Sequence, residues 1–130
     1  MTMRLLLDTH ALIWWWKNDP TLPTAARAAM TATSNQVFVS AASGWELATK
    51  IRKGQLLEMR ASLPAFAEDV IRDGFYHLPV TAQHGVHGGS LSGAHKDPFD
   101  RLIAAQALLD DMTVVTRDRE IAKFGCKVLW

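Results

Sequence analysis

The sequence predicts an α/β protein, a three-layer sandwich with helices on both faces of a mainly parallel central sheet. Short apolar runs alternate along the chain with longer stretches of helical composition, and the runs are continuously apolar. Strands buried on both faces have such sequences, and a helix is the usual connection between parallel strands. The 130 residues are 48% hydrophobic, enough to bury roughly two-thirds of the unfolded surface. We therefore expect residues 1–130 to form a single domain.

Five segments have the length and composition of buried strands. Each is a short run rich in leucine, valine or aromatic residues and bounded by polar or turn-forming residues. These segments are residues 4–8 (RLLLD), 36–41 (QVFVSA), 75–80 (FYHLPV), 112–116 (MTVVT) and 127–130 (KVLW).

Helices are predicted between these strands from composition and from start and stop signals. They are expected at residues 9–17, 24–32, 43–54, 62–74, from 81 into a glycine-rich loop, from 97, and at 119–125. Ser43 and Glu46 have capping-box spacing, so the third helix should begin at Ser43 and end at Gly54. Asp97 precedes Pro98, which predicts an N-cap followed by proline at the first helical position.

The net charge, the cysteine content and the lengths of the apolar runs limit the partners and the cellular location that the sequence predicts. Fourteen basic and thirteen acidic residues leave a net charge of +1, so any binding of a polyanion must depend on local arrangement. Cys126 is the single cysteine, which excludes an internal disulfide and fits a reducing compartment. No apolar run approaches the ~18 residues of a membrane span, and Asp8 interrupts the N-terminal one. We expect a cytoplasmic protein without a membrane partner.

Four acids occupy equivalent positions in this predicted topology. Asp8 and Asp118 directly follow predicted strands, and Glu46 and Asp100 fall in the first turns of predicted helices. Strand ends and helix starts share one edge of a parallel sheet, where ligands bind. Taken singly, each acid is explained as a cap, turn or surface residue. Together they predict four converging carboxylates.

Converging carboxylates repel one another unless a cation lies between them. No lysine or arginine accompanies all four, whereas Mg²⁺ or Mn²⁺ prefers such oxygen ligands. This chemistry predicts metal-assisted attack of water on a phosphate ester, with one ion or two. Asp97 is explained as a cap, but Asp100 enters an almost wholly apolar helix, where an ionised carboxylate needs a partner.

Four stretches resemble PIN-domain ribonucleases of the VapC toxin type. They are LLLDTHALIWW, SGWELATKIRKGQL, HKDPFDRLIAAQAL and VVTRDREIAKFG, in this order. The resemblance implies a Mg²⁺- or Mn²⁺-dependent endoribonuclease that cleaves RNA and is neutralised by a cognate antitoxin. It also implies that Asp8, Glu46, Asp100 and Asp118 are the catalytic metal ligands, with Thr116 as a nearby hydroxyl and Asp97 at most an outer partner. One departure is the glycine-rich stretch before Asp97, where many relatives have proline and bulky residues.

Several basic side chains are candidates for binding RNA phosphates. Lys50, Arg52 and Lys53 follow Glu46 on one predicted helix, although a solvated face explains at least one of them equally well. Arg117 adjoins a predicted ligand and is a further candidate. Arg101 has a similar place in the sequence, and either arginine could simply pair with neighbouring acids.

The histidines predict less. His10 and His95 lie near the predicted centre, where they could assist, but a loop or packing role is the simpler interpretation. His84 and His87 are three residues apart, yet no further cysteine or histidine cluster completes a zinc site. We interpret these two as surface residues.

The stretch Trp14-Trp15-Trp16 predicts a binding surface. Three consecutive helical residues spread over about 200°, so at least one indole should turn away from the core. Exposed aromatic residues are enriched at interfaces. Together with the resemblance, this predicts a homodimer and an antitoxin segment near the first helix.

Two other functions compete with the nuclease. An aspartyl-phosphate phosphatase typically needs an acid two residues after the strand-end aspartate, where this chain has His10. The second is a catalytically inert PIN-like interaction module, against which the presence of all four acids argues, because packing does not require them. Mg²⁺-dependent cleavage of RNA that is abolished by Asp8→Asn would distinguish the nuclease from the inert module.

Overall fold

The computed structural model describes residues 2–130 and contains the predicted α/β sheet. Its five strands lie in the order β3-β2-β1-β4-β5, and all pairs are parallel. The strands are β1 (Arg4–Leu7), β2 (Gln36–Ser40), β3 (Tyr76–Leu78), β4 (Thr113–Val115) and β5 (Lys127–Leu129). The predicted fold class is confirmed, because each expected strand forms and pairs in one sheet.

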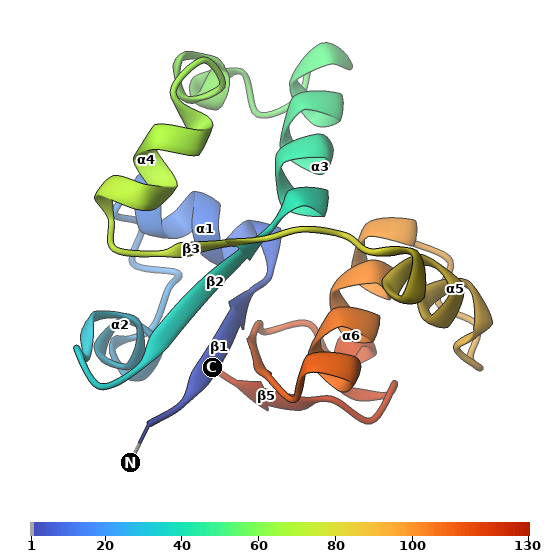
Figure 1. The fold of residues 1–130 in the computed structure, drawn as a ribbon. Helices are drawn as coiled ribbons and strands as arrows, with labels where there is room; N and C mark the ends of the chain where they lie inside the picture. The colour runs from blue at the N-terminus through green and yellow to red at the C-terminus, as the bar shows by residue number, and fades with distance from the viewer. Residues whose placement is uncertain (1) are drawn as a thin grey trace.

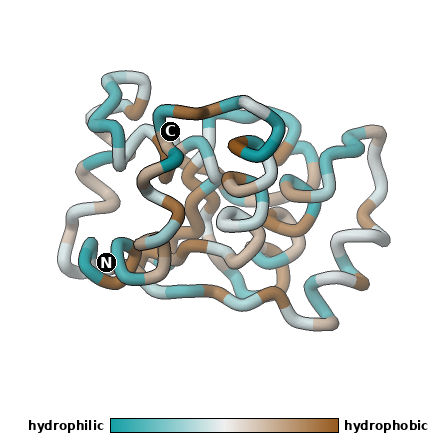
Figure 2. Tube along the Cα trace, turned by 90° about the horizontal axis from the view of Figure 1, so that it is seen from above, coloured by the Kyte–Doolittle hydropathy of each residue, from teal (hydrophilic) through white to brown (hydrophobic). Residues whose placement is uncertain are grey.

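Helices cover both faces of the sheet (Figure 1). They are α1 (Thr9–Trp16), α2 (Thr24–Thr31), α3 (Ala41–Arg52), α4 (Phe66–Arg72), α5 (Ala82–Ser90), α6 (Pro98–Asp110) and α7 (Arg119–Ala122), with a 3₁₀ helix, η1 (Leu57–Ser62). Leu5 and Leu7 of β1 pack in one core with α1, α2 and α4, whereas Leu6 packs with α6 and α7. Successive side chains of β1 point to opposite faces of the sheet, so this strand contributes leucines to the core on each face. The hydrophobic segments gather toward the middle of the molecule (Figure 2). Within residues 2–130, every helix is too short or too polar to cross a membrane.

The start of α3 differs from the prediction. The helix follows β2 without a loop, and the N-cap is Ser40, whose Oγ accepts a hydrogen bond from the Ala42 N–H at 3.0 Å. The predicted capping box is therefore wrong, because Ser43 is already helical and Glu46 lies in the second turn. The predicted end at Gly54 is confirmed, with φ at 84°, a conformation that glycine adopts without strain.

The helix predicted for residues 62–74 begins later than expected, and a 3₁₀ helix that was not predicted precedes it. Residues Leu57–Ser62 form η1, and α4 begins only at Phe66, without a side-chain cap. Pro64 separates them, because proline has no N–H to continue a helical hydrogen-bond ladder. Ser62 therefore ends one helix instead of starting the next.

The expectation of an outward-facing indole on α1 is wrong. Trp14, Trp15 and Trp16 are all half-buried and pack against the core on the α1 side of the sheet. Asp73, at the end of α4, accepts hydrogen bonds from Nε1 of both Trp15 and Trp16, at 3.1 and 2.8 Å. Asp73, which is far from α1 in the sequence, thus binds the indole N–H groups of Trp15 and Trp16. The local sequence around α1 does not predict this contact. The exposed indole is that of Trp45, at 63%.

The interpretation of His84 as a surface residue is also wrong. Its side chain is buried, and its Nδ1 accepts a hydrogen bond from the Thr81 N–H at 3.0 Å. Nε2 lies 3.1 Å from Oδ2 of Asp110 on α6. The ring therefore joins the start of α5 to the end of α6, a role that depends on helix packing.

Candidate active site

The four predicted acids line one cavity of about 530 Å³ at the carboxyl edge of the sheet. Each is carried by a different strand end or helix: Asp8 after β1, Glu46 on α3, Asp100 on α6 and Asp118 after β4. The parallel order of the strands brings these segments together although they are far apart in the sequence. The cavity is large enough for a ligand of nucleotide size.

Asp8 and Asp118 are linked through Thr116. The Thr116 hydroxyl donates to Oδ2 of Asp8 at 2.7 Å and accepts from the Asp118 N–H at 2.9 Å. Asp8 also caps α1 through the His10 N–H, and Asp118 caps α7 through the Glu120 N–H. Burial raises the pKa of Asp8 above 3.8, and the hydrogen bond from Thr116 opposes this rise. This side of the cavity is held by hydrogen bonds at strand ends.

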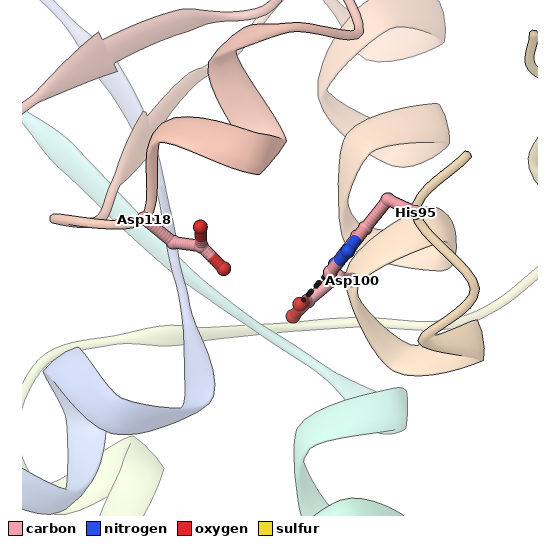
Figure 3. A group of neighbouring side chains, drawn as sticks. All are labelled: His95, Asp100 and Asp118. Carbon is pink, nitrogen blue, oxygen red and sulfur yellow. Dashed lines mark hydrogen bonds and ion pairs between the residues drawn. The ribbon is translucent and has the colours of Figure 1, made fainter. Parts of the chain in front are cut away.

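Asp100 is held by an imidazole. Nε2 of His95 lies 2.8 Å from Oδ2 of Asp100 (Figure 3). Burial raises the pKa of Asp100 from 3.8 to about 7; His95 opposes this rise, while Asp97, Asp8 and Glu46 add to it. The hydrogen bond to Asp100 raises the pKa of His95 in turn. A short hydrogen bond therefore joins the two side chains and favours the charged forms of both.

Glu46 faces the same cavity from α3. One carboxylate oxygen, Oε2, pairs with Lys50 at 2.8 Å, one helical turn further on. The other, Oε1, is buried and has no hydrogen-bond partner among residues 2–130. A buried carboxylate oxygen without a partner is costly, so this atom is available to a cation.

The donor set fits a divalent metal ion. Single ligand atoms of His95, Asp100 and Asp118 lie within 4.8 Å of one another, and Asp8 and Glu46 line the same cavity. Carboxylate oxygens suit Mg²⁺ and Mn²⁺, and an imidazole nitrogen is more typical of the transition metals. The unpartnered Oε1 of Glu46 and the mutual effects of the carboxylates on pKa fit a bound positive charge.

The remaining predicted residues lie in different places. Asp97 caps α6, accepting from the N–H groups of Phe99 and Asp100 at 2.9 and 3.3 Å, as predicted. It also lines the cavity, as do Lys50 and the exposed Arg117. Lys53 instead lies at the exposed C-terminal end of α3 and is not among the residues lining the cavity.

Sequence reasoning gave too little weight to three neighbours of the acids. His95 contacts Asp100 directly, and its position just before DPFD was the available signal. Trp14 and Trp130 form an apolar wall, with ring centroids 5.6 Å apart and the Arg117 guanidinium 4.6 Å from the Trp14 ring centroid. No local pattern predicts that the last residue of the chain reaches this cavity.

Comparison with protein families agrees with this geometry. The family model for the PIN domain matches residues 5–126, nearly the whole chain. The chain belongs to the PIN domain family. No curated protein matches the sequence of this PIN domain at a significant level.

Solved structures share the same fold over almost their full length. VapBC2 from Rickettsia felis, bound to a promoter DNA fragment, aligns with a TM-score of 0.72 and 19% identity, covering 98% of each chain. VapBC-1 from nontypeable Haemophilus influenzae gives 0.70 and 21%, covering 98% of this chain and 97% of that one. FitAcB from Neisseria gonorrhoeae gives 0.61 and 21%, covering 97% and 96%. At these identities the likeness concerns the fold of the PIN domain.

Proposed function

We propose that this PIN domain is a metal-dependent endoribonuclease of the VapC toxin type, and that residues 1–130 act as one nuclease domain. The observation that carries the proposal is the convergence of four carboxylates on one cavity, with a buried Glu46 oxygen to which no other described residue donates a hydrogen bond. Packing alone gives no reason to bury such a group. A phosphodiester hydrolysed with the help of Mg²⁺, or of Mn²⁺, matches this set of ligands.

The proposed roles follow from the contacts of each side chain. Asp8, Glu46, Asp100 and Asp118 would hold the cation, which when bound supplies a water of lowered pKa and screens the phosphate charge. Thr116 keeps the Asp8 carboxylate oriented through its hydroxyl. His95 holds a proton between Nε2 and Oδ2 of Asp100.

Two cations at the rim are proposed to position the RNA. The exposed Arg117 would contact a phosphate beside the cavity. Lys50 is engaged by Glu46 and would contribute only when that pair opens on metal binding. We expect Lys53, outside the cavity, to add at most a weak electrostatic contribution.

The partner is proposed to be a cognate antitoxin. VapBC2, VapBC-1 and FitAcB, which share this fold, are known as complexes. An antitoxin segment that places a basic side chain in the acidic cavity would compete with the cation. Such a pair would act in the cytoplasm, where RNA is available.

A homodimer is the second proposed assembly. It does not rest on Trp14 to Trp16, which are half-buried and pack against the core of the same chain. It rests on Val86 of α5 and Leu109 of α6, which are 73% and 45% exposed and line one apolar hollow. Light scattering of the purified chain and of Val86→Asp tests this, with a dimer expected only for the unmodified chain.

The decisive experiment uses a circular RNA, which only an endonuclease can open. Wild type with Mg²⁺ or Mn²⁺ should linearise it, and EDTA should prevent this. Asp8→Asn should be inactive, whereas Glu68→Gln, at an exposed acid on α4, should match wild type. Product ends should lack a 2′,3′-cyclic phosphate, because water and not the 2′-hydroxyl is the nucleophile. Intact RNA under all conditions would instead favour the inert interaction module.

A further inference from the structure

Arg101 follows Asp100 directly, yet its side chain points away from the acids. Its guanidinium donates hydrogen bonds to three backbone carbonyls, those of Gly88 at 2.9 Å, His95 at 2.8 Å and Leu91. All three belong to one segment, residues 88–95. The planar fork of arginine can reach several acceptors in fixed directions, which a lysine ammonium cannot reproduce. Its donors are therefore directed inward and not toward RNA phosphates.

The segment that Arg101 holds is the end of α5 and the loop after it, and this loop has little stiffness of its own. Residues 88–95 contain three glycines and two serines, and glycine loses more conformational freedom on ordering than any other residue. Gly88 allows α5 to approach α6 closely, because a Cβ there would lie 3.2 Å from the Arg101 carbonyl oxygen. The segment thus lies against the first turns of α6. The hydrogen bonds from Arg101 hold it there, because its own sequence does not make it rigid.

Phe124 supports the same arrangement from the opposite side. Its ring centroid lies 5.4 Å from Cζ of Arg101 and 6.1 Å from the centroid of the His95 ring. One aromatic side chain after α7 therefore contacts both the arginine and the histidine. The guanidinium and the imidazole thus pack against the same ring.

The segment ends at the imidazole that contacts Asp100. His95 Nε2 lies 2.8 Å from the Asp100 carboxylate, and a ligand atom of Asp118 is within 4.8 Å of both side chains. We propose that Arg101 is a positioning residue, which holds residues 88–95 so that His95 Nε2 keeps the Asp100 carboxylate directed toward the cation that Asp100 and Asp118 would hold. Its effect on RNA cleavage rests on the proposed nuclease function, whereas its effects on the segment and on cation binding do not.

The test compares wild type, Arg101→Gln, His95→Ala and the double variant, with Arg72→Gln as a control. Arg72 is an exposed arginine on α4 that pairs only with Asp69 among the described residues. Three quantities are measured: amide hydrogen exchange of residues 88–96, Mn²⁺ affinity by calorimetry, and kcat and KM for RNA cleavage.

Arg101→Gln should accelerate exchange in residues 88–96 while leaving α1 and the sheet protected. Mn²⁺ affinity and kcat should each fall about tenfold, a typical cost of removing an outer partner of a metal ligand, with KM nearly unchanged. Arg101→Lys should recover part of this loss. In the His95→Ala background, Arg101→Gln should add less than twofold, because the imidazole that Arg101 positions is already absent. Arg72→Gln should match wild type.

The proposal would be overturned if the losses in Mn²⁺ affinity and kcat of the two single variants multiplied fully in the double variant. Unchanged amide hydrogen exchange of residues 88–96 in Arg101→Gln would also overturn it. If Arg101→Gln does not fold, the same cycle with Arg101→Lys decides, and failure of both to fold would assign Arg101 to global stability instead. If wild type does not cleave RNA, the proposed function fails, but exchange and Mn²⁺ affinity still test the role of Arg101.

Discussion

The two sides of the acidic cavity are held in different ways. Asp8, Thr116 and Asp118 follow neighbouring strands, where Leu7 pairs with Val115, so their hydrogen bonds follow from strand register. Asp100 instead depends on His95, at the end of a glycine-rich segment that Arg101 holds. Backbone pairing orients one side, and side-chain contacts between α6 and the segment just before it orient the other. This difference predicts how each side responds to substitution, pH and metal.

Loss of either central acid should have the largest effect. Asp8→Asn and Asp100→Asn should each reduce kcat for RNA cleavage by more than about 100-fold, beyond the usual cost of an outer partner. Both variants should keep their circular dichroism spectra, because an amide fits the same space. If either retains more than a tenth of wild-type activity, that acid is not a metal ligand in the proposed sense.

The next largest effect is expected at Asp100, in the pH dependence of the stability of the metal-free protein. Its pKa rises from 3.8 to about 7 on folding, so its contribution to stability is complete below pH 3.8 and lost as the pH rises through 7. At pH 8, Asp100→Asn should be more stable than wild type by up to about 4 kcal/mol, and the difference should vanish near pH 4. Urea unfolding in EDTA measures this. A difference independent of pH would contradict it.

Removal of one hydrogen-bonding partner on each side compares the sides directly. Thr116→Val leaves Oδ2 of the buried Asp8 without its donor and should destabilise the metal-free protein by about 1–3 kcal/mol. His95→Ala should cost less than about 1 kcal/mol, since one hydrogen bond of a half-buried ring is lost. Denaturant unfolding at pH 8 checks both. The reverse order would show that the strand-end side is not the more rigid one.

The smallest effect is expected at Asp97. Asparagine caps a helix about as well as aspartate, so Asp97→Asn should change the unfolding free energy by less than about 0.5 kcal/mol, whereas Asp97→Ala should cost about 1 kcal/mol. Cleavage by Asp97→Asn should remain within a few-fold of wild type. Inactivity equal to that of Asp100→Asn would mean that Asp97 contributes a ligand in addition to its cap.

Much of the fold was predictable because its signals are local. The continuous apolar runs predicted the strands, and the Asp97-Pro98 pair predicted the start of α6. Where a tertiary contact or a second local signal competed, the prediction failed. Ser40 capped α3 ahead of Ser43, and the helix expected at residues 62–74 began only at Phe66, after Pro64. The exposure of the α1 indoles depended on Asp73, which no local pattern connects with them.

The sequence by itself determined which edge of the sheet carries the four acids, because parallel strands align their carboxyl ends whatever the connections between them. The tertiary structure alone decided how those acids are held. The Lys50–Glu46 pair follows from i, i+4 spacing on α3, but the contact of His95 with Asp100 and the inward direction of Arg101 depend on how the chain folds back from α5 onto α6. Register is a short-range property of paired backbones. Side-chain partners between distant helices are instead set by packing distances that no local pattern encodes.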